Sequence, residues 1–346
     1  MAAAFAASCS MASPAPAPTA TPAPCESHVA TFLNTASRSG SGQAAIYGLI
    51  RSAASCDAVT DVQVIAFQGG ADVRTLFIHA AAQADASGRF SVEVPPGTYR
   101  VLFLPGATTK GVAPSWWKDT ASFGGGTNIT VDTSDVALGD VLLPAGYAIR
   151  GTLADAQSHA GLAGASVAVV RAVARSGAAG VDYVTIGRTE RDGRYSLAVP
   201  AGRFQVEFIP DYPYAAMWWR NAESFAAADD LVVQDVTTGI DVLATRGKTV
   251  TGRITYNGAP SANIAVMAVA GNAPCCELGD GGRTDQDGRY RFALHDGAYR
   301  LALYAATGSG SEVRPFWLGG SGAFNDATVV QVNRDISGLD FALSGP

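Results

Sequence analysis

One pattern occurs three times along this chain, and the length of the repeat restricts the folds that are possible. A turn of the type Ser/Asp-Gly-Arg-aromatic is found at residues 87–90, 192–195 and 287–290. Its glycines are 105 residues apart from Gly88 to Gly193, and 95 residues apart from Gly193 to Gly288. Solenoid repeats are much shorter, because one such unit cannot bury a core alone. A unit of about 100 residues can form a domain with its own core, so the sequence predicts three domains in tandem.

The segments around each turn show the alternation of β-strands. Apolar and polar residues alternate over 90–94, 195–199 and 290–294, and a second turn and a second alternating run follow each time. Strict alternation between Gly, Pro and Asp turns is typical of β-hairpins, so we expect each pair of runs to form a hairpin. With a glycine-containing opening run and a short closing run, each unit has about seven short strands. That number predicts a two-sheet β-sandwich.

The predicted fold class is therefore all-β: three tandem seven-stranded Greek-key β-sandwiches after a disordered N-terminal segment rich in Pro and Ala. We expect the N-terminal segment and the three sandwiches to span residues 1–43, 44–145, 146–247 and 248–346. The connections Pro144-Ala145-Gly146 and Thr245-Arg246-Gly247 are very short. Because they leave little room to bend, we expect a fairly stiff rod.

The order of these features resembles the carboxypeptidase regulatory-like domain, a transthyretin-like (prealbumin-like) sandwich close to the starch-binding-like fold. The motifs that carry the resemblance are the opening strand with its glycine, residues 284–290 (TDQDGRY) and residues 95–101 (PPGTYRV). The resemblance covers residues 44 to 346 and implies a spacer, an adhesin stalk or an accessory module. One such fold hosts many functions, so the resemblance selects none of them.

Charge and hydrophobicity limit the environment and the partners. The formal net charge of -6 argues against a nucleic-acid-binding protein, which usually carries a basic patch. No window approaches the ~18 apolar residues of a membrane span. The apolar start of the chain before the Pro/Ala/Thr run at 12–24 resembles the end of an export signal. Cys9 follows Ala6-Ala7-Ser8, which resembles a lipobox without its usual Leu. A lipid-anchored protein and an ordinary signal remnant remain alternatives, and both predict a bacterial extracellular or surface protein.

The other four cysteines predict an oxidising environment. We expect Cys25 and Cys56 to form a disulfide that ties the N-terminal segment to the first domain. Adjacent Cys275 and Cys276 would then form a vicinal disulfide in a loop. None of the five cysteines has CxxC zinc-site spacing, and free thiols in a reducing compartment are the alternative.

No catalytic, metal or cofactor site is expected. His28, His79, His159 and His295 lack a His or Glu at metalloprotease spacing, and residues 319–323 lack the strand-turn-helix context of a serine-hydrolase elbow. The run from Asp285 to Gly288 has no Glu at position twelve of a calcium loop. We interpret it as a turn in which the glycine has positive φ and the Asp caps the backbone.

Each unit also contains a pair of adjacent aromatic residues, Trp116-Trp117, Trp218-Trp219 and Phe316-Trp317. Adjacent side chains of an extended segment point in opposite directions, so one of each pair is expected to fill the core. Since Trp117, Trp219 and Trp317 share the second position, they are the expected core residues. Trp116, Trp218 and Phe316 are then expected to face outward, where they would either do nothing further or bind a sugar.

Three functional hypotheses follow. The first is a monomeric, non-enzymatic surface protein that acts as a spacer or an adhesive module, with another surface protein as partner. The second is an accessory protein that binds a starch-like polysaccharide through the outward aromatic residues. The third is an enzyme of unrecognised type.

Overall fold

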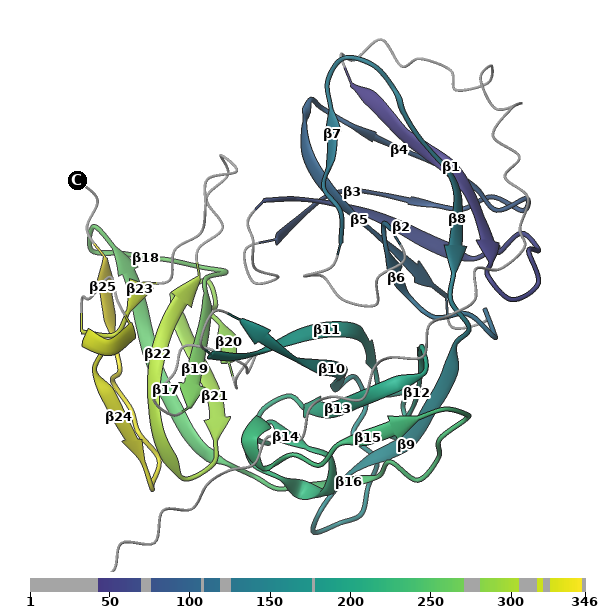
Figure 1. Cartoon of the computed structure of the whole chain (residues 1–346). Helices are drawn as coiled ribbons and strands as arrows, with labels where there is room; N and C mark the ends of the chain where they lie inside the picture. The colour runs from purple at the N-terminus through teal and green to yellow at the C-terminus, as the bar shows by residue number, and fades with distance from the viewer. Residues whose placement is uncertain are drawn as a thin grey trace, which may run out of the picture.

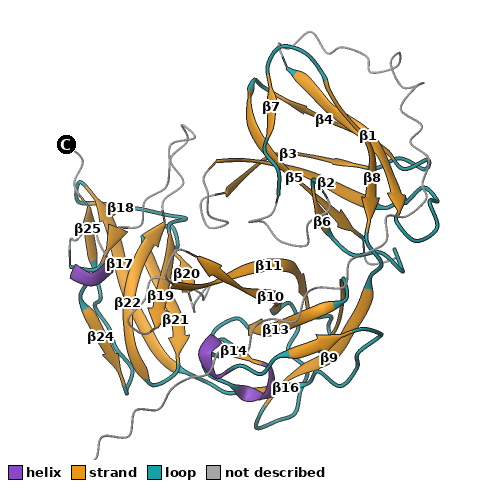
Figure 2. Cartoon of the chain, in the orientation of Figure 1, coloured by secondary structure: helices purple, strands orange, loops and turns teal. Residues whose placement is uncertain are grey.

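The computed structural model describes residues 43–69, 76–106, 109–118, 126–175, 178–270, 281–304, 316–319 and 324–343. Within these ranges the chain is all-β, with three tandem β-sandwiches and three short 3-10 turns (Figure 2). The three units follow an arc rather than a straight line (Figure 1). No helix in this part of the chain is long and apolar enough to cross a membrane.

The first unit is formed by eight strands. They are β1 (Ala44–Ser52), β2 (Val62–Gly69), β3 (Leu76–Gln83), β4 (Arg89–Val94), β5 (Gly97–Pro105), β6 (Ser115–Trp116), β7 (Ile129–Val131) and β8 (Val136–Leu143). One sheet has the order β4-β1-β8, with β8 parallel to β1. The other has the order β3-β2-β5-β6, with β7 also paired to β5. The seven strands other than the two-residue β6 make up the predicted sandwich.

The second unit repeats this arrangement. Its elements are β9 (Tyr147–Asp155), β10 (Ser166–Arg175), β11 (Ala178–Arg188), β12 (Arg194–Val199), β13 (Gly202–Ile209), β14 (Met217–Trp218), η3 (Trp219–Asn221), η4 (Phe225–Ala227), β15 (Leu231–Val233) and β16 (Val242–Ala244). The sheets have the orders β12-β9-β16 and β11-β10-β13-β14, with β15 paired to β13. The parallel pair is again formed by the first and last strands of the unit.

The third unit completes the series. Its elements are β17 (Lys248–Tyr256), β18 (Ala259–Pro260), β19 (Ala265–Ala270), β20 (Gly281–Arg283), β21 (Arg289–Leu294), β22 (Gly297–Tyr304), β23 (Phe316–Trp317), η5 (Phe324–Asp326), β24 (Val329–Val332) and β25 (Phe341–Leu343). The sheets have the orders β18-β17-β21, with β25 parallel to β17, and β20-β19-β22-β23, with β24 paired to β22.

Each unit buries its own core between its two sheets. The inward residues alternate along the strands, as in β4 and β12, where every second side chain is buried. Aromatic rings from the two sheets meet edge to face, with centroids 5.3 Å apart for Phe90 and Phe103 and 5.6 Å apart for Tyr195 and Phe208. Edge-to-face contact is the favoured geometry for such pairs. The three cores are separate clusters of buried side chains.

The predicted hairpins are wrong. The two alternating runs of each unit do not pair with one another: β4 pairs with β1, whereas β5 pairs with β2. The other two units show the same arrangement. Each pair of runs therefore forms an arch that crosses from one sheet to the other. Its strands face each other across the core instead of sharing hydrogen bonds.

The repeated glycine turn has the geometry that its sequence predicts. Gly88, Gly193 and Gly288 have φ of +77°, +80° and +73°. Asp285 Oδ1 accepts hydrogen bonds from the backbone nitrogens of Asp287 at 3.0 Å and Arg289 at 2.8 Å. An aspartate that binds the backbone in this way is the usual cap of such a turn. The part of the chain that the structure describes contains no cluster of His, Cys, Asp or Glu side chains able to hold a metal ion.

The glycine of each opening strand is needed because a carbonyl group lies against it. A Cβ added to Gly151 would be 2.0 Å from the carbonyl oxygen of Ile240, and one added to Gly252 would be 2.1 Å from that of Leu339. The Tyr195 hydroxyl donates to the same Ile240 oxygen at 2.7 Å. The opening-strand glycine thus leaves room for the same carbonyl oxygen that the tyrosine of the turn motif binds. Burial raises the pKa of this tyrosine well above its usual range, and the Asp241 carboxylate adds to the effect.

Candidate functional site at the joints between units

The same set of backbone hydrogen bonds links the units at both joints. At the first joint, Ala113 N donates to Pro144 O at 2.9 Å and Gly146 N donates to Gly111 O at 3.0 Å. The bridge between Val112 and Ala145 lies between these two bonds. The short linker is therefore paired along its length with the loop that precedes β6. A linker whose amides are bound in this way is not a free hinge.

The second joint repeats this pairing at the equivalent positions. Ala215 N donates to Thr245 O at 3.3 Å, and Gly247 N donates to Pro213 O at 3.1 Å. The bridge between Tyr214 and Arg246 corresponds to the bridge between Val112 and Ala145. At both joints, therefore, the linker is held against the loop of the preceding unit in the same way.

Side chains strengthen the second joint. From the third unit, His295 Nε2 lies 3.0 Å from the carbonyl oxygen of Ala216, and its Nδ1 lies 3.5 Å from Glu223 Oε1. The Tyr212 hydroxyl is 3.3 Å from Thr249 Oγ1. The Arg291 guanidinium lies over the Tyr212 ring, 4.1 Å from its centroid. Cation–π contacts of this kind contribute about 0.5–1 kcal/mol at exposed sites.

Strand β11 of the second unit carries a charge that acts on the first unit. Burial lowers the pKa of the Arg100 guanidinium on β5, and the Asp182 carboxylate on β11 opposes this shift. Asp182 is buried. Opposite charges from the first and second units therefore interact electrostatically.

A polar cluster at the end of β9 supports the loop that forms the second joint. The Tyr214 hydroxyl donates to Asp155 Oδ2 at 2.6 Å, and the backbone nitrogens of Gln157 and Ser158 donate to Asp155 Oδ1. The hydrogen bond from Tyr214, followed by those from Ser158, holds the pKa of Asp155 well below its usual range. The same contact with Asp155 raises the pKa of Tyr214.

This cluster predicts an acid-sensitive contribution to stability. Because the pKa of Asp155 is depressed in the folded state, its contribution is fully present above the unfolded pKa of about 3.9 and is lost as pH falls through the folded pKa. We expect Asp155→Asn to reduce the loss of unfolding free energy between pH 5 and strongly acidic solution. Urea unfolding of the full chain across this range, with Asp211→Asn as a control for the loss of one exposed carboxylate, tests the expectation. Parallel pH profiles for the wild type and Asp155→Asn would contradict it.

The predicted outward aromatic residues are buried in two of the three units. Trp116 is 4% exposed and Trp218 is 2% exposed, while Phe316 is 37% exposed. Trp116 and Trp218 do point away from the sandwich core, as alternation requires. They lie on the outer face of the larger sheet, however, and are covered there. Trp218 packs on Ala168 and Val170, and the Phe225 ring closes over it with centroids 5.4 Å apart.

The sequence alignment of the third pair is also wrong by one position. Trp116, Trp218 and Trp317 occupy the same register, opposite Leu102, Glu207 and Ala302. Trp317 is 3% exposed and packs against Phe324, as Trp218 packs against Phe225. In the second and third units this tryptophan is therefore the one that the phenylalanine of the following loop covers, and in the first unit Trp116 packs against Phe67, with ring centroids 5.4 Å apart. Trp117 and Trp219, which we expected to fill the core, pack against it only partly buried, and Leu318 takes their place in the third unit.

The predicted cysteine sites lie largely outside the described residues. Cys9, Cys25, Cys275 and Cys276 are not among them. Cys56 is disulfide-bonded, and its pairing with Cys25 stays a prediction. The joint residues Tyr212, Tyr214 and His295 were not predicted to act together. The only sequence signal was the shortness of the linkers.

Comparison with known proteins gives no family. No protein-family model matches the chain, and no curated protein is similar to it in sequence. Similar solved structures include the Bacillus anthracis TIE protein, with 13% identity, a TM-score of 0.24, and coverage of 88% of this chain and 50% of that chain. The chain thus spans half the length of that protein.

Two pilins are also similar. A Streptococcal ancillary pilin has 12% identity and a TM-score of 0.23, and the match covers 88% of this chain and 99% of that chain. Shaft pilin SpaA from Lactobacillus rhamnosus GG has 10% identity and a TM-score of 0.23, with coverage of 59% and 98%. TM-scores this low establish no relationship between the chains.

Proposed function

We propose that this chain is a non-enzymatic bacterial surface protein in which three β-sandwiches, with the boundaries 44–145, 146–247 and 248–346, form a stiff spacer that presents a binding surface. The observation that carries the proposal is the repeated pairing of each linker with the preceding unit. Free linkers would let the domains move independently, which is the usual behaviour of domains with small interfaces. A joint built the same way twice favours a protein that holds a distance. The resemblance to transthyretin-like, carboxypeptidase regulatory-like domains belongs to this proposal, as does export.

A starch-binding role for the aromatic pairs is not part of the proposal. The rings of Trp116 and Trp218 would have to be exposed to stack on a sugar, and both are buried. Protease treatment of intact cells tests the surface location, because a surface protein is digested before the cells are lysed.

Stiffness is tested by small-angle X-ray scattering of the full chain. We expect the wild type to fit one arrangement of the three units, and Tyr212→Ala/His295→Ala to fit only a broader ensemble, because the variant removes the side-chain contacts of the second joint. The matched control is Tyr256→Ala/His159→Ala, which removes the same residue types from exposed positions within units. A wild type that already requires a broad ensemble would refute the spacer.

A further inference from the structure

A groove of about 740 Å³ lies where the second unit meets the outer face of the β17–β21 pair. Tyr212 of the second unit lines it, and the third unit supplies the rest of the lining. Four exposed arginines are among the lining residues: Arg253, Arg283, Arg289 and Arg291. The lining also holds two carboxylates, Asp285 and Asp340, and the Asp287 carboxylate is paired with Arg289, so these groups together have a formal charge of +1 (four minus three) on a chain whose net charge is -6.

Two of the arginines form a cross-strand pair that lowers the stability of the sheet. Arg253 on β17 lies directly opposite Arg289 on β21 in the strand register. Like charges in such cross-strand pairs are destabilising. The same two positions hold Leu49 and Arg89 in the first unit, and Thr152 and Arg194 in the second. The fold forms without the arginine pair, so the pair is a property of the third unit alone.

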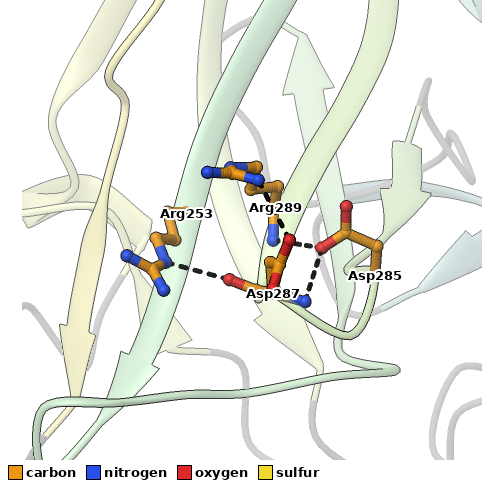
Figure 3. A network of polar contacts seen from close by, with 4 residues as sticks. All are labelled: Arg253, Asp285, Asp287 and Arg289. Carbon is orange, nitrogen blue, oxygen red and sulfur yellow. Dashed lines mark hydrogen bonds and ion pairs between the residues drawn. The ribbon is translucent and has the colours of Figure 1, made fainter.

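The contacts around the pair hold the guanidinium groups in place (Figure 3). Arg289 Nη1 lies 3.0 Å from Asp287 Oδ2, and Arg253 Nε donates to the backbone carbonyl of Asp287 at 2.9 Å. The Asp340 carboxylate accepts from the Arg253 backbone nitrogen at 2.8 Å. Side chains already held by such contacts lose little freedom when they bind a ligand.

The lining indicates the class of ligand. Guanidinium groups bind carboxylates through two parallel hydrogen bonds. The central part of a protein–protein interface is apolar, whereas the described lining of the groove contains no aliphatic side chain and, of its two rings, Tyr290 is buried. A polar chain that carries regularly repeated carboxylates fits this surface better than a protein does. Thr251 adds a hydroxyl, and Tyr212, which is 40% exposed, adds part of a ring.

We propose that this groove binds an acidic polysaccharide that carries uronate carboxylates. The site is separate from the aromatic pairs, and its ligand class differs from a starch-like glucan. The proposal does not depend on a stiff second joint, because Arg253 and Arg289 both lie on the third unit.

The test is calorimetric titration of the full chain with polygalacturonate fragments at low and moderate salt. We expect binding that weakens as salt rises, since screening reduces the attraction between exposed charges. We expect Arg253→Gln/Arg289→Gln to weaken it by at least about tenfold, because two guanidinium–carboxylate pairs are lost. Circular dichroism confirms that the variant is folded.

The matched control is Arg150→Gln/Arg194→Gln, which removes two charges from the outer face of the corresponding strands β9 and β12 of the second unit. We expect this variant to bind like the wild type. Equal weakening by both double variants would show a net-charge effect and overturn the proposed site. So would equal binding of poly-glutamate or single-stranded DNA, or no binding of polygalacturonate by the wild type.

Discussion

Replacing Trp218 with alanine is expected to lower the free energy of unfolding of the second unit by roughly 3–5 kcal/mol, the usual cost of removing a large buried aromatic side chain. The ring is 2% exposed and lies between Ala168 and Val170 on one side and Phe225 on the other. Its loss would also remove the partner that holds the loop at η4 against the sheet. Hydrogen exchange of the β10 and β13 peptides in the full chain measures the effect without relying on tryptophan fluorescence.

The neighbouring ring provides the control. Trp219 is only partly buried, and its ring lies beneath the Arg220 guanidinium, 4.6 Å from the centroid. The equivalent position of the third unit is Leu318, so the fold accepts a smaller side chain there. We expect Trp219→Leu to cost less than about 1.5 kcal/mol. A larger cost for Trp219→Leu than for Trp218→Ala would show that the second position is the buried one after all.

This pair shows where sequence comparison between the units failed. When the pairs of adjacent aromatic residues are aligned by sequence, Phe316 corresponds to Trp116 and Trp218. In the strand register, Trp317 corresponds to them instead. The tryptophan common to the three units is buried, but Trp218 and Trp317 belong to clusters separate from the sandwich cores that we expected the common ring to fill. The residues after the second position contain the missing signal. Lys118, Arg220 and Gly319 all have positive φ, and only Gly319 is of a residue type that favours it, so the sequence carries this signal in the third unit alone.

The sandwich itself was predictable because alternation and turn spacing are local properties of the chain. The pairing of its strands was not. A hairpin and an arch both show two alternating runs around a tight turn, and they differ only in whether the strands share hydrogen bonds or face each other across a core. The partner of β4 is β1, whose paired residues lie 40 to 50 positions earlier in the chain, and no local pattern encodes that choice.

The joints and the groove were harder to predict from the sequence than the sandwich fold. Tyr212 and Arg291 are almost 80 residues apart and meet only because the linker fixes the third unit against the second. The arginine pair of the groove could have been noticed, because the position of Arg253 holds Leu49 and Thr152 in the other units, whereas the position of Arg289 is an arginine in all three. Only the strand register shows that the two arginine side chains lie opposite each other.

Gly151→Ala is expected to destabilise the second unit by about 2–4 kcal/mol. The added Cβ would lie 2.0 Å from the Ile240 carbonyl oxygen and 2.5 Å from its carbon. Both are backbone atoms, so the segment leading to β16 must move away from β9, and such overpacking costs typically ~1–3 kcal/mol. The displaced carbonyl also loses the hydrogen bond from Tyr195, whose net contribution is about 1 kcal/mol.

Two further variants separate the cost of overpacking from the cost of the lost hydrogen bond. Tyr195→Phe removes only the hydrogen bond and should cost about 1 kcal/mol, and the first unit already carries Phe90 at this position. Gly187→Ala places a Cβ against the end of the Leu197 side chain, which can move, so we expect it to be nearly neutral. Hydrogen exchange of the β9 and β12 peptides gives the local unfolding free energy of each variant. If Gly151→Ala were as mild as Gly187→Ala, the glycine would not be needed for the close approach of Ile240, and its recurrence in the opening strand of every unit would require another physical reason.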